Sequence, residues 1–325
     1  MWRETGRALV HAIHHALLDG AFVRLWGKMA FGRIQPVHEN VEENPMKSIL
    51  LVGQSNMAGR GYLDAVPTVY NENAFMLRNG RWQLMTEPIH FDRSVAGIGP
   101  AGAFAALWCH DHPGEQIGLI PCAEGGSAID EWAPEGTLFR HAVSEVRFAL
   151  ESSELIGILW HQGESDAHEG GYRTYRERLA AVVRALRSEL GAEGLPFVVG
   201  ELADFLGKSG FGLSATEYER INDEIHRFVE DESGCYLVSA EGLSCNPDGI
   251  HIDAVSQRRF GVRYYRAFEG RRNVTAALPD EDELLEACIN QHALTRTEQL
   301  HLDMTAFAQG HMSYEELAAS LGMSR

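Results

Sequence analysis

The sequence contains a short apolar run that passes straight into a glycine-bearing turn, Ile49-Leu50-Leu51-Val52-Gly53-Gln54-Ser55-Asn56-Met57-Ala58-Gly59. Four consecutive apolar residues without polar alternation are typical of a central strand that is buried on both faces of a parallel sheet. In such sheets the carboxyl ends of the strands form the crevice where substrates bind. The turn that holds Ser55 is therefore predicted to lie where a reactive side chain meets substrate.

Further apolar runs of the same kind follow, and helical stretches separate them. The runs span Gln116–Pro121, Leu155–Trp160, Leu195–Gly200 and Cys235–Ser239. The clearest helix is predicted at Tyr172–Leu190, where apolar residues recur at i, i+3 and i+4. Because strands alternate with helices, we expect a three-layer α/β/α sandwich around a central, mostly parallel sheet.

The two ends of the chain differ from this α/β region. Residues 1–45 are predicted to form a helical extension and linker, residues 46–275 the α/β domain, and residues 276–325 an acidic extension of two or three short helices. Met1 and Met46 are both candidates for the natural start. The amphipathic pattern of the two extensions suggests an arm through which the protein forms a homo-oligomer.

Composition and charge exclude several classes of protein. The chain of 325 residues has 45% hydrophobic and 23% charged residues, which is ordinary globular usage. Its net charge of -18 repels phosphate backbones and anionic lipid heads, so we expect no nucleic-acid partner and no membrane partner. The five cysteines form no CxxC pair, which argues against a disulfide framework and a zinc ribbon. A cytoplasmic location is predicted.

Ser55 has two interpretations. A serine after a strand often caps the next helix. To act as a nucleophile, it needs a base and a carboxylate that orients the base. The loop Asn246-Pro247-Asp248-Gly249-Ile250-His251 offers both, because on a turn Asp248 can hold one imidazole nitrogen of His251 while the other faces Ser55. The alternative is a surface histidine beside an Asx turn.

The segment Trp160-His161-Gln162-Gly163-Glu164-Ser165-Asp166 follows another predicted strand, at the same edge of the sheet. Acyl transfer needs hydrogen-bond donors aimed at the developing oxyanion, and the amide of Gln162 is a candidate. The alternative is a polar turn that caps the helix near Tyr172. A metal site at His161 and Glu164 is the weaker hypothesis, because an i, i+3 pair on a loop fixes little geometry.

Two glycine-rich segments complete the candidate site. Gly97-Ile98-Gly99-Pro100-Ala101-Gly102 precedes an apolar helix, and one of its three glycines can place a backbone N–H beside the oxyanion. Gly125-Gly126-Ser127, together with Trp132, follows the strand that ends at Pro121 and is predicted to line the substrate pocket. The alternative for Trp132 is a place in the core.

Taken in this order, the segments resemble the SGNH hydrolases, and within them the carbohydrate acetylesterases related to sialate O-acetylesterase and to family 6 acetylxylan esterases. The resemblance covers about residues 47–270 and rests on five blocks: 53–59, 99–105, 125–132, 160–166 and 248–251. Two departures stand out. The asparagine of the superfamily's third block is replaced by Gln162, as is typical of this subfamily, and Ala101 interrupts the usual Gly-Pro-Gly.

The resemblance implies an SGNH (flavodoxin-like) fold with a catalytic triad of Ser55, His251 and Asp248. It also implies an oxyanion hole formed by the Ser55 N–H, a glycine N–H, for which we choose Gly99, and the amide of Gln162. The residues that we assign to substrate binding are neighbours of these groups in the same blocks: Gln54, Asn56, Gly125, Gly126, Ser127, Trp132 and Glu164.

The function that the resemblance implies is removal of a short acyl group, acetyl above all, from a sugar hydroxyl through an acyl-enzyme. The substrate is a small-molecule or oligosaccharide ester, and no metal or organic cofactor is required. Two alternatives are a lipase, thioesterase or aryl esterase of the same superfamily, and a non-catalytic carbohydrate-binding protein that keeps the fold.

Overall fold

A seven-stranded sheet forms the centre of the protein, as a computed structural model that describes residues 45–323 shows. The predicted extension at residues 1–44 lies outside the described residues. All neighbouring strands are parallel except β2 and β3. In spatial order the strands are β3 (Arg81–Leu84), β2 (Ala74–Arg78), β4 (Ile117–Pro121), β1 (Met46–Gly53), β5 (Ser153–His161), β6 (Phe197–Gly200) and β7 (Cys235–Val238).

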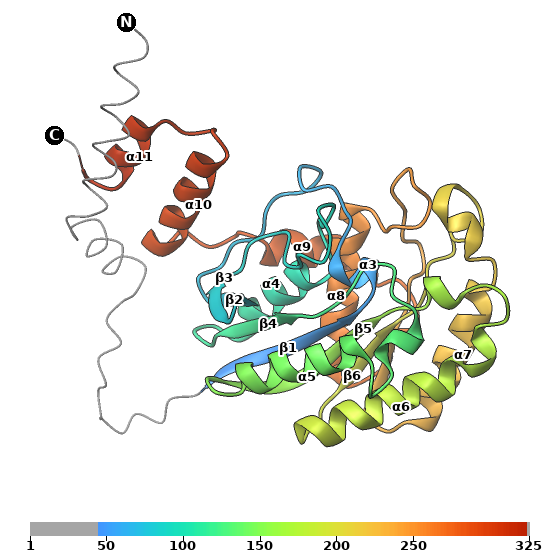
Figure 1. The fold of residues 1–325 in the computed structure, drawn as a ribbon. Coiled ribbons are helices and arrows are strands. Elements are labelled where there is room, and N and C mark those ends of the chain that lie inside the picture. Colours follow the sequence, from blue (N-terminus) through green and yellow to red (C-terminus); the bar gives the residue numbers. More distant parts are fainter. Residues whose placement is uncertain (1–44, 324–325) are drawn as a thin grey trace, which may run out of the picture. The chain divides into compact units, whose positions relative to one another are not determined.

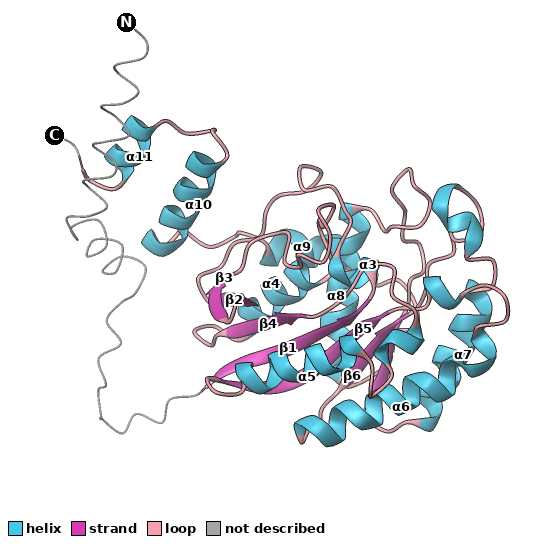
Figure 2. Cartoon of the chain, in the orientation of Figure 1, coloured by secondary structure: helices cyan, strands magenta, loops and turns pink. Residues whose placement is uncertain are grey.

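Helices cover both faces of this sheet (Figures 1 and 2). One face packs against α4 (Ala101–Asp111), α8 (Ala254–Gly270) and α9 (Glu281–Cys288). The other face packs against α5 (Thr137–Ala149), α6 (Tyr172–Leu190) and α7 (Tyr218–Asp231). The predicted three-layer α/β/α sandwich is therefore confirmed.

The strand β1 shows why apolar runs without alternation form the centre of the sheet. Ile49 and Leu51 point into the core beneath α4 and α8, whereas Leu50 and Val52 point into the core beneath α5 and α6. All four side chains are fully buried. The other four predicted runs become β4, β5, β6 and β7, with ends that differ from the prediction by at most two residues.

The hairpin of β2 and β3 was not predicted. Its two strands are short, and β3, the edge strand, has no buried residue, so the apolar pattern is weak. The turn carries the signal, because Asn79 and Gly80 both have positive φ angles, of 51° and 68°. An Asn-Gly pair between two such segments is typical of a tight hairpin turn.

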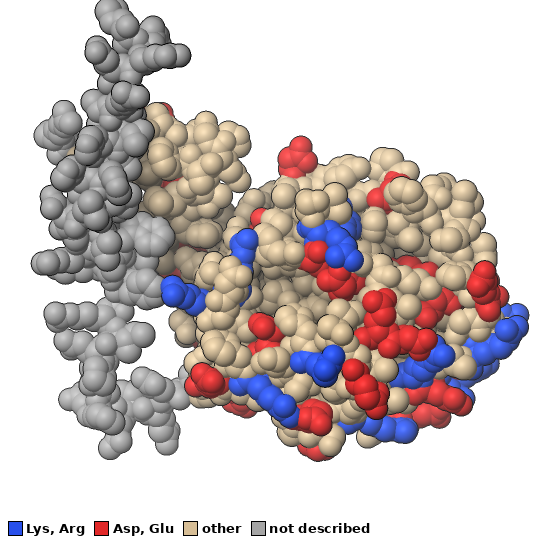
Figure 3. All heavy atoms as spheres, viewed as in Figure 1, with Lys and Arg blue, Asp and Glu red and all other residues tan. Residues whose placement is uncertain are grey.

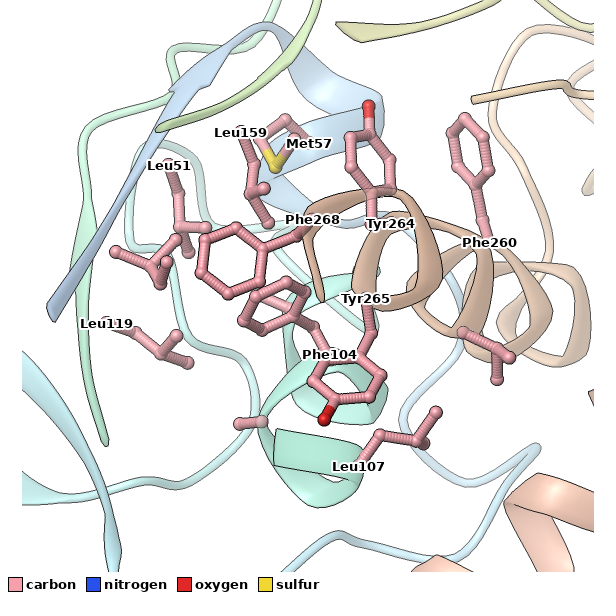
Figure 4. Packing of buried hydrophobic residues seen from close by; sticks show 14 of the residues in the cluster. Leu51, Met57, Phe104, Leu107, Leu119, Leu159, Phe260, Tyr264, Tyr265 and Phe268 are labelled. Atoms are coloured by element: carbon pink, nitrogen blue, oxygen red, sulfur yellow. The ribbon is translucent and has the colours of Figure 1, made fainter. Parts of the chain in front are cut away.

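The core beneath α4 and α8 anchors the turn that follows β1. Met57, two residues after Ser55, is fully buried and lies beside Leu159 and Tyr264 (Figure 4). Phe104 of α4 packs edge-on against Tyr265 and Phe268 of α8, with ring centres 5.6 Å and 5.4 Å apart. The short helix α3 (Ser55–Ala58) therefore rests on closely packed core side chains.

The C-terminal part contains three helices, as predicted: α9, α10 (Arg296–Ala308) and α11 (Tyr314–Ser320). Of these, α9 packs on the core. Its first residue, Glu281, pairs with Arg263 of α8, which is 1% exposed; Arg263 Nε and Glu281 Oε1 are 2.5 Å apart. Leu284 and Leu285 pack against the same core. The domain boundary near residue 276 stays a prediction.

Acidic and basic side chains are interspersed over the face of the molecule drawn in Figure 3. Several of them pair between neighbouring helices, such as Arg147 with Glu189 and Arg176 with Asp231. Within residues 45–323, no helix has both the length and the apolar character needed to cross a membrane.

Candidate active site

The site begins where β1 and β5 end side by side. Gln54 N–H donates to His161 O at 2.8 Å, so the two strand ends are joined just before the chain turns away. Gly53 has a φ angle of 127°, and a Cβ atom there would lie 2.0 Å from His161 O. Only glycine fits this close approach, which aims Ser55 out of the sheet.

Ser55, His251 and Asp248 form a continuous chain of hydrogen-bonding groups. Ser55 Oγ lies 3.1 Å from His251 Nε2, and His251 Nδ1 lies 2.8 Å from Asp248 Oδ2. The side chains of His251 and Asp248 are 20% and 28% exposed, so the site opens to solvent. The alternative of Ser55 as a helix cap is wrong, because Gln54 occupies the N-cap position of α3.

The loop that carries Asp248 is built to keep its carboxylate charged. The backbone N–H groups of Ile250 and His251 both donate to Asp248 Oδ1 at 3.0 Å. Partial burial alone would raise the pKa of Asp248, but these bonds and the imidazole of His251 outweigh it and hold that pKa below its usual value. A charged Asp248 fixes the Nδ1–H tautomer of His251 and leaves Nε2 free to accept the Ser55 proton.

Among the backbone N–H groups near Ser55, those of Ser55 and Gly99 have no acceptor among the described residues. Gly99 packs on the turn, where a Cβ atom would lie 3.0 Å from Met57 O and 3.1 Å from Gly59 Cα. Of the other two candidate glycines, Gly97 donates to Gly59 O at 3.0 Å, and Gly102, in the first turn of α4, packs against the Glu87–Arg258 pair and not against the turn of Ser55. The structure therefore favours Gly99 among the three.

The structure lends no support to the prediction that Gln162 donates to the oxyanion, which stays a prediction. Its side chain is fully buried, and its amide nitrogen lies 2.6 Å from Asp166 Oδ2, 3.1 Å from Ser127 O and 3.2 Å from Gln54 Oε1. Both amide hydrogens are thus committed to protein acceptors. Gln162 instead joins the turn after β5, which includes the short helix η2 (Glu164–Asp166), to the segment after β4.

Four residues that we predicted to bind substrate are buried and occupied by the protein. Trp132, in the short helix η1 (Ile129–Trp132), packs against Trp160 in the core and donates to the hydroxyl of Ser127 at 3.0 Å. The remaining two, Asn56 and Glu164, are each 2% exposed and bond to each other, with Asn56 Nδ2 and Glu164 Oε1 2.5 Å apart. The structure therefore lends no support to these four assignments, because the side chains are buried and bonded within the protein.

Gln54 and Gly126 keep groups that are free for a ligand, whereas the N–H of Gly125 is bonded to Asp92. The amide oxygen of Gln54 accepts from Gly163 N–H, but its amide nitrogen donates to no described residue and is not among the fully enclosed polar atoms. Gly126 has a φ angle of 81°, and a Cβ atom there would meet nothing within 4 Å. These three residues remain candidates for substrate binding.

A buried ion pair that no sequence pattern predicted holds the Gly125 loop. Arg60 and Asp92 are 5% and 3% exposed at their side chains, and Asp92 Oδ2 accepts from Gly125 N–H at 2.8 Å. A Cβ atom at Gly125 would lie 2.3 Å from the Arg60 guanidinium. Arg60 directly follows the glycine turn, but no local pattern marks Asp92 as its partner.

The proposed metal ligands His161 and Glu164 are 3.5 Å apart at Nδ1 and Oε1. Within residues 45–323, they belong to no group of three or more histidine, cysteine or acidic side chains that is arranged to hold a metal. The metal hypothesis therefore gains no support from the structure.

A mostly parallel sheet that is covered on both faces and carries a strand-end serine beside a histidine and an aspartate is the arrangement expected of an SGNH hydrolase. Comparison with known proteins gives the family. Residues 45–269 match the model of the family described as "carbohydrate esterase, sialic acid-specific acetylesterase", and the chain belongs to this family of carboxylic ester hydrolases.

Individual relatives agree with this placement. A probable carbohydrate esterase of Arabidopsis thaliana is 29% identical over 253 residues, which is 69% of this chain and 90% of that protein. An X-ray structure of an Arabidopsis thaliana protein has a TM-score of 0.63 at 27% identity, and covers 70% of this chain and 98% of its own. A carbohydrate acetylesterase of Xanthomonas citri shares the fold, with a TM-score of 0.51 at 22% identity over 69% of this chain and 56% of its own.

Proposed function

We propose that the protein removes short acyl groups, acetyl above all, from a carbohydrate hydroxyl, with Ser55 as nucleophile, His251 as base and Asp248 as the group that orients the base. The observation that carries this proposal is the chain of contacts from Ser55 Oγ to His251 Nε2, at 3.1 Å, and from His251 Nδ1 to Asp248 Oδ2, at 2.8 Å. The family supports the ester chemistry, and its description supports an acetylated sugar as substrate.

The reaction proceeds through an acyl-enzyme in two steps. His251 Nε2 accepts the Ser55 proton while Ser55 Oγ attacks the ester carbonyl, and the free N–H groups of Ser55 and Gly99 stabilise the oxyanion. His251 then protonates the departing sugar oxygen. In the second step water loses a proton to His251 and attacks the acyl-enzyme, which releases the acid and restores Ser55.

The outer parts of the site are proposed to hold the sugar. Gly125 and Gly126 lie on a loop that the Arg60–Asp92 pair holds through the N–H of Gly125. The amide nitrogen of Gln54, which has no acceptor among the described residues, lies on the turn next to Ser55. The proposed reaction uses side chains, backbone N–H groups and water.

The test is hydrolysis of p-nitrophenyl acetate by the wild type and by Ser55→Ala. We expect the variant to lose at least about a thousandfold in kcat, because the covalent step needs the hydroxyl. Equal rates would remove Ser55 from the mechanism and would favour a non-catalytic role for this site.

A second measurement separates the acetylesterase from its relatives with other substrates. We expect acetyl esters to be cleaved faster than octanoyl esters, and acetate to be released from at least one member of a panel of acetylated sugars and glycans. A preference for octanoyl esters would point to a lipase or thioesterase instead.

A further inference from the structure

Asn56 contacts the protein on both sides of His251. Its Oδ1 accepts from Ile252 N–H at 2.9 Å, and its Nδ2 donates to Ile250 O at 3.1 Å. Ile250 and Ile252 are the two chain neighbours of His251, and Asn56 is itself the chain neighbour of Ser55. One amide side chain therefore links the backbone of the nucleophile to the backbone of the base.

We infer that Asn56, oriented by Glu164, is a positioning residue that sets the distance between Ser55 and His251. The inference rests on the proposed function, because it concerns the nucleophile and base named there. Ser55 and His251 are 196 positions apart in the sequence, and their side chains must meet within hydrogen-bond reach for proton transfer. A misplacement of about 1 Å can cost about a hundredfold in rate.

Glu164 determines which way the Asn56 amide points. A carboxylate without a proton only accepts hydrogen bonds, so Glu164 Oε1, 2.5 Å away, requires the Nδ2 end of Asn56 to face it. With this orientation the Oδ1 end meets Ile252 N–H. The reversed amide would place oxygen against both Glu164 and Ile250 O, which loses three hydrogen bonds.

The surroundings leave neither residue free to bind substrate. Gln257 of α8 donates to Asn56 O at 3.0 Å, so the backbone of Asn56 is held as firmly as its side chain. On the other side, His161 donates through Nε2 to Glu201 O at 3.1 Å, and its Nδ1 lies 3.5 Å from Glu164 Oε1. Since Asn56 and Glu164 are 2% exposed, their loss should change kcat rather than KM.

The experiment is a double-variant cycle with Asn56→Asp, Glu164→Gln and the combination of both, measured as kcat and KM for p-nitrophenyl acetate. Asn56→Asp puts an acceptor against Glu164 and Ile250 O, and we expect kcat to fall by about a hundredfold or more. Glu164→Gln keeps an acceptor and has a smaller effect. In the double variant the glutamine amide introduced at position 164 can donate to the new carboxylate, so we expect at least about a tenfold recovery of kcat over Asn56→Asp alone.

Two controls keep the result unambiguous. Glu154→Gln changes the same residue type at the opposite end of β5, where the side chain is 55% exposed, and should leave kcat unchanged. If Asn56→Asp does not fold, Asn56→Ala removes the link without adding charge, and its circular dichroism and kcat give the same comparison.

If Asn56 has only a structural role, kcat should not recover in the double variant. If Asn56 or Glu164 contacts substrate, KM should change. Either result overturns the inference. Ser55→Ala separates it from the proposed function. Full activity of Ser55→Ala would remove the mechanism itself. An inactive Ser55→Ala beside a fully active Asn56→Ala would remove only the role of Asn56.

Discussion

At the scale of single residues, burial and hydrogen-bond donors shift the pKa values of Asp166 and Asp248 in opposite directions. Asp166 is buried, and burial raises its pKa although Gln162 and the Ile129 N–H donate to it. Asp248 is partly exposed and receives two backbone N–H bonds besides the imidazole, which together lower its pKa. Asp248 is therefore the carboxylate that can stabilise a positive charge on His251.

His90 gives a prediction about stability and pH. Burial lowers its pKa from 6.5 to about 4, with Asp92 opposing the shift and Arg60 adding to it. The unfolded chain takes up a proton as pH falls below 6.5, but the folded protein does not until about pH 4. The contribution of this residue to folding stability is therefore complete well above pH 6.5 and falls by roughly 2 to 3 kcal/mol between pH 7 and pH 4.5.

The measurement is urea unfolding of the wild type and of His90→Gln at pH 7 and pH 4.5. Because glutamine does not titrate in this range, the variant should lose roughly 2 to 3 kcal/mol less than the wild type over the same interval. Equal losses in the two proteins would show that His90 is not the group responsible.

At the scale of elements, the junction of β1 and α3 is the most constrained backbone in the site. For Gly53→Ala we expect a loss of more than about 2 kcal/mol in the free energy of unfolding, and loss of esterase activity. The reason is that the new Cβ atom would lie 2.0 Å from His161 O, in the neighbouring strand. The strand ends would have to separate, and Ser55 would move away from His251.

Gly114→Ala is the matched control, since Gly114, in the loop between α4 and β4, also has a positive φ angle but a Cβ atom there meets nothing within 4 Å. Its cost should be only the backbone strain, about 1–2 kcal/mol. Thermal unfolding and p-nitrophenyl acetate hydrolysis give both comparisons. Similar losses in the two variants would argue against the contact with β5 as the cause.

At the scale of the whole molecule, contacts between α8 and α9 bear on the domain boundary predicted near residue 276. A chain that ends after residue 275 loses Glu281 and leaves the buried Arg263 without its carboxylate. We expect this truncation to cost about 3–5 kcal/mol. A chain that ends after residue 290 keeps α9 and loses mainly the hydrogen bonds of Thr295 and Glu298 to Glu72, about 2 kcal/mol or less.

Urea unfolding of the two truncated chains beside the full chain tests this expectation. If both truncations are equally stable, α9 does not belong to the esterase domain and the boundary near residue 276 holds. The homo-oligomer and the cytoplasmic location stay predictions, and sedimentation of the full and shortened chains tests the first of them.

Local sequence pattern was enough for the central strands, the helix at Tyr172–Leu190 and the segments that bring Ser55 and His251 to one edge of the sheet. This is because buried parallel strands consist of apolar residues throughout, and their carboxyl ends share one edge by construction. The Asp248–His251 pair is also local, since both residues lie on one turn. The edge hairpin of β2 and β3 carried too weak an apolar pattern to be predicted.

The roles of the polar residues around Ser55, His251 and Asp248 depended on the tertiary structure. Asn56 and Glu164 are 108 positions apart, and Gln162 reaches Ser127 across 35 positions, so no local pattern shows that these side chains bond to each other rather than to substrate. Trp132 likewise stands among polar neighbours in sequence but packs in the core. Burial results from contacts between distant segments, and only those contacts distinguish a residue that binds substrate from one that holds the site together.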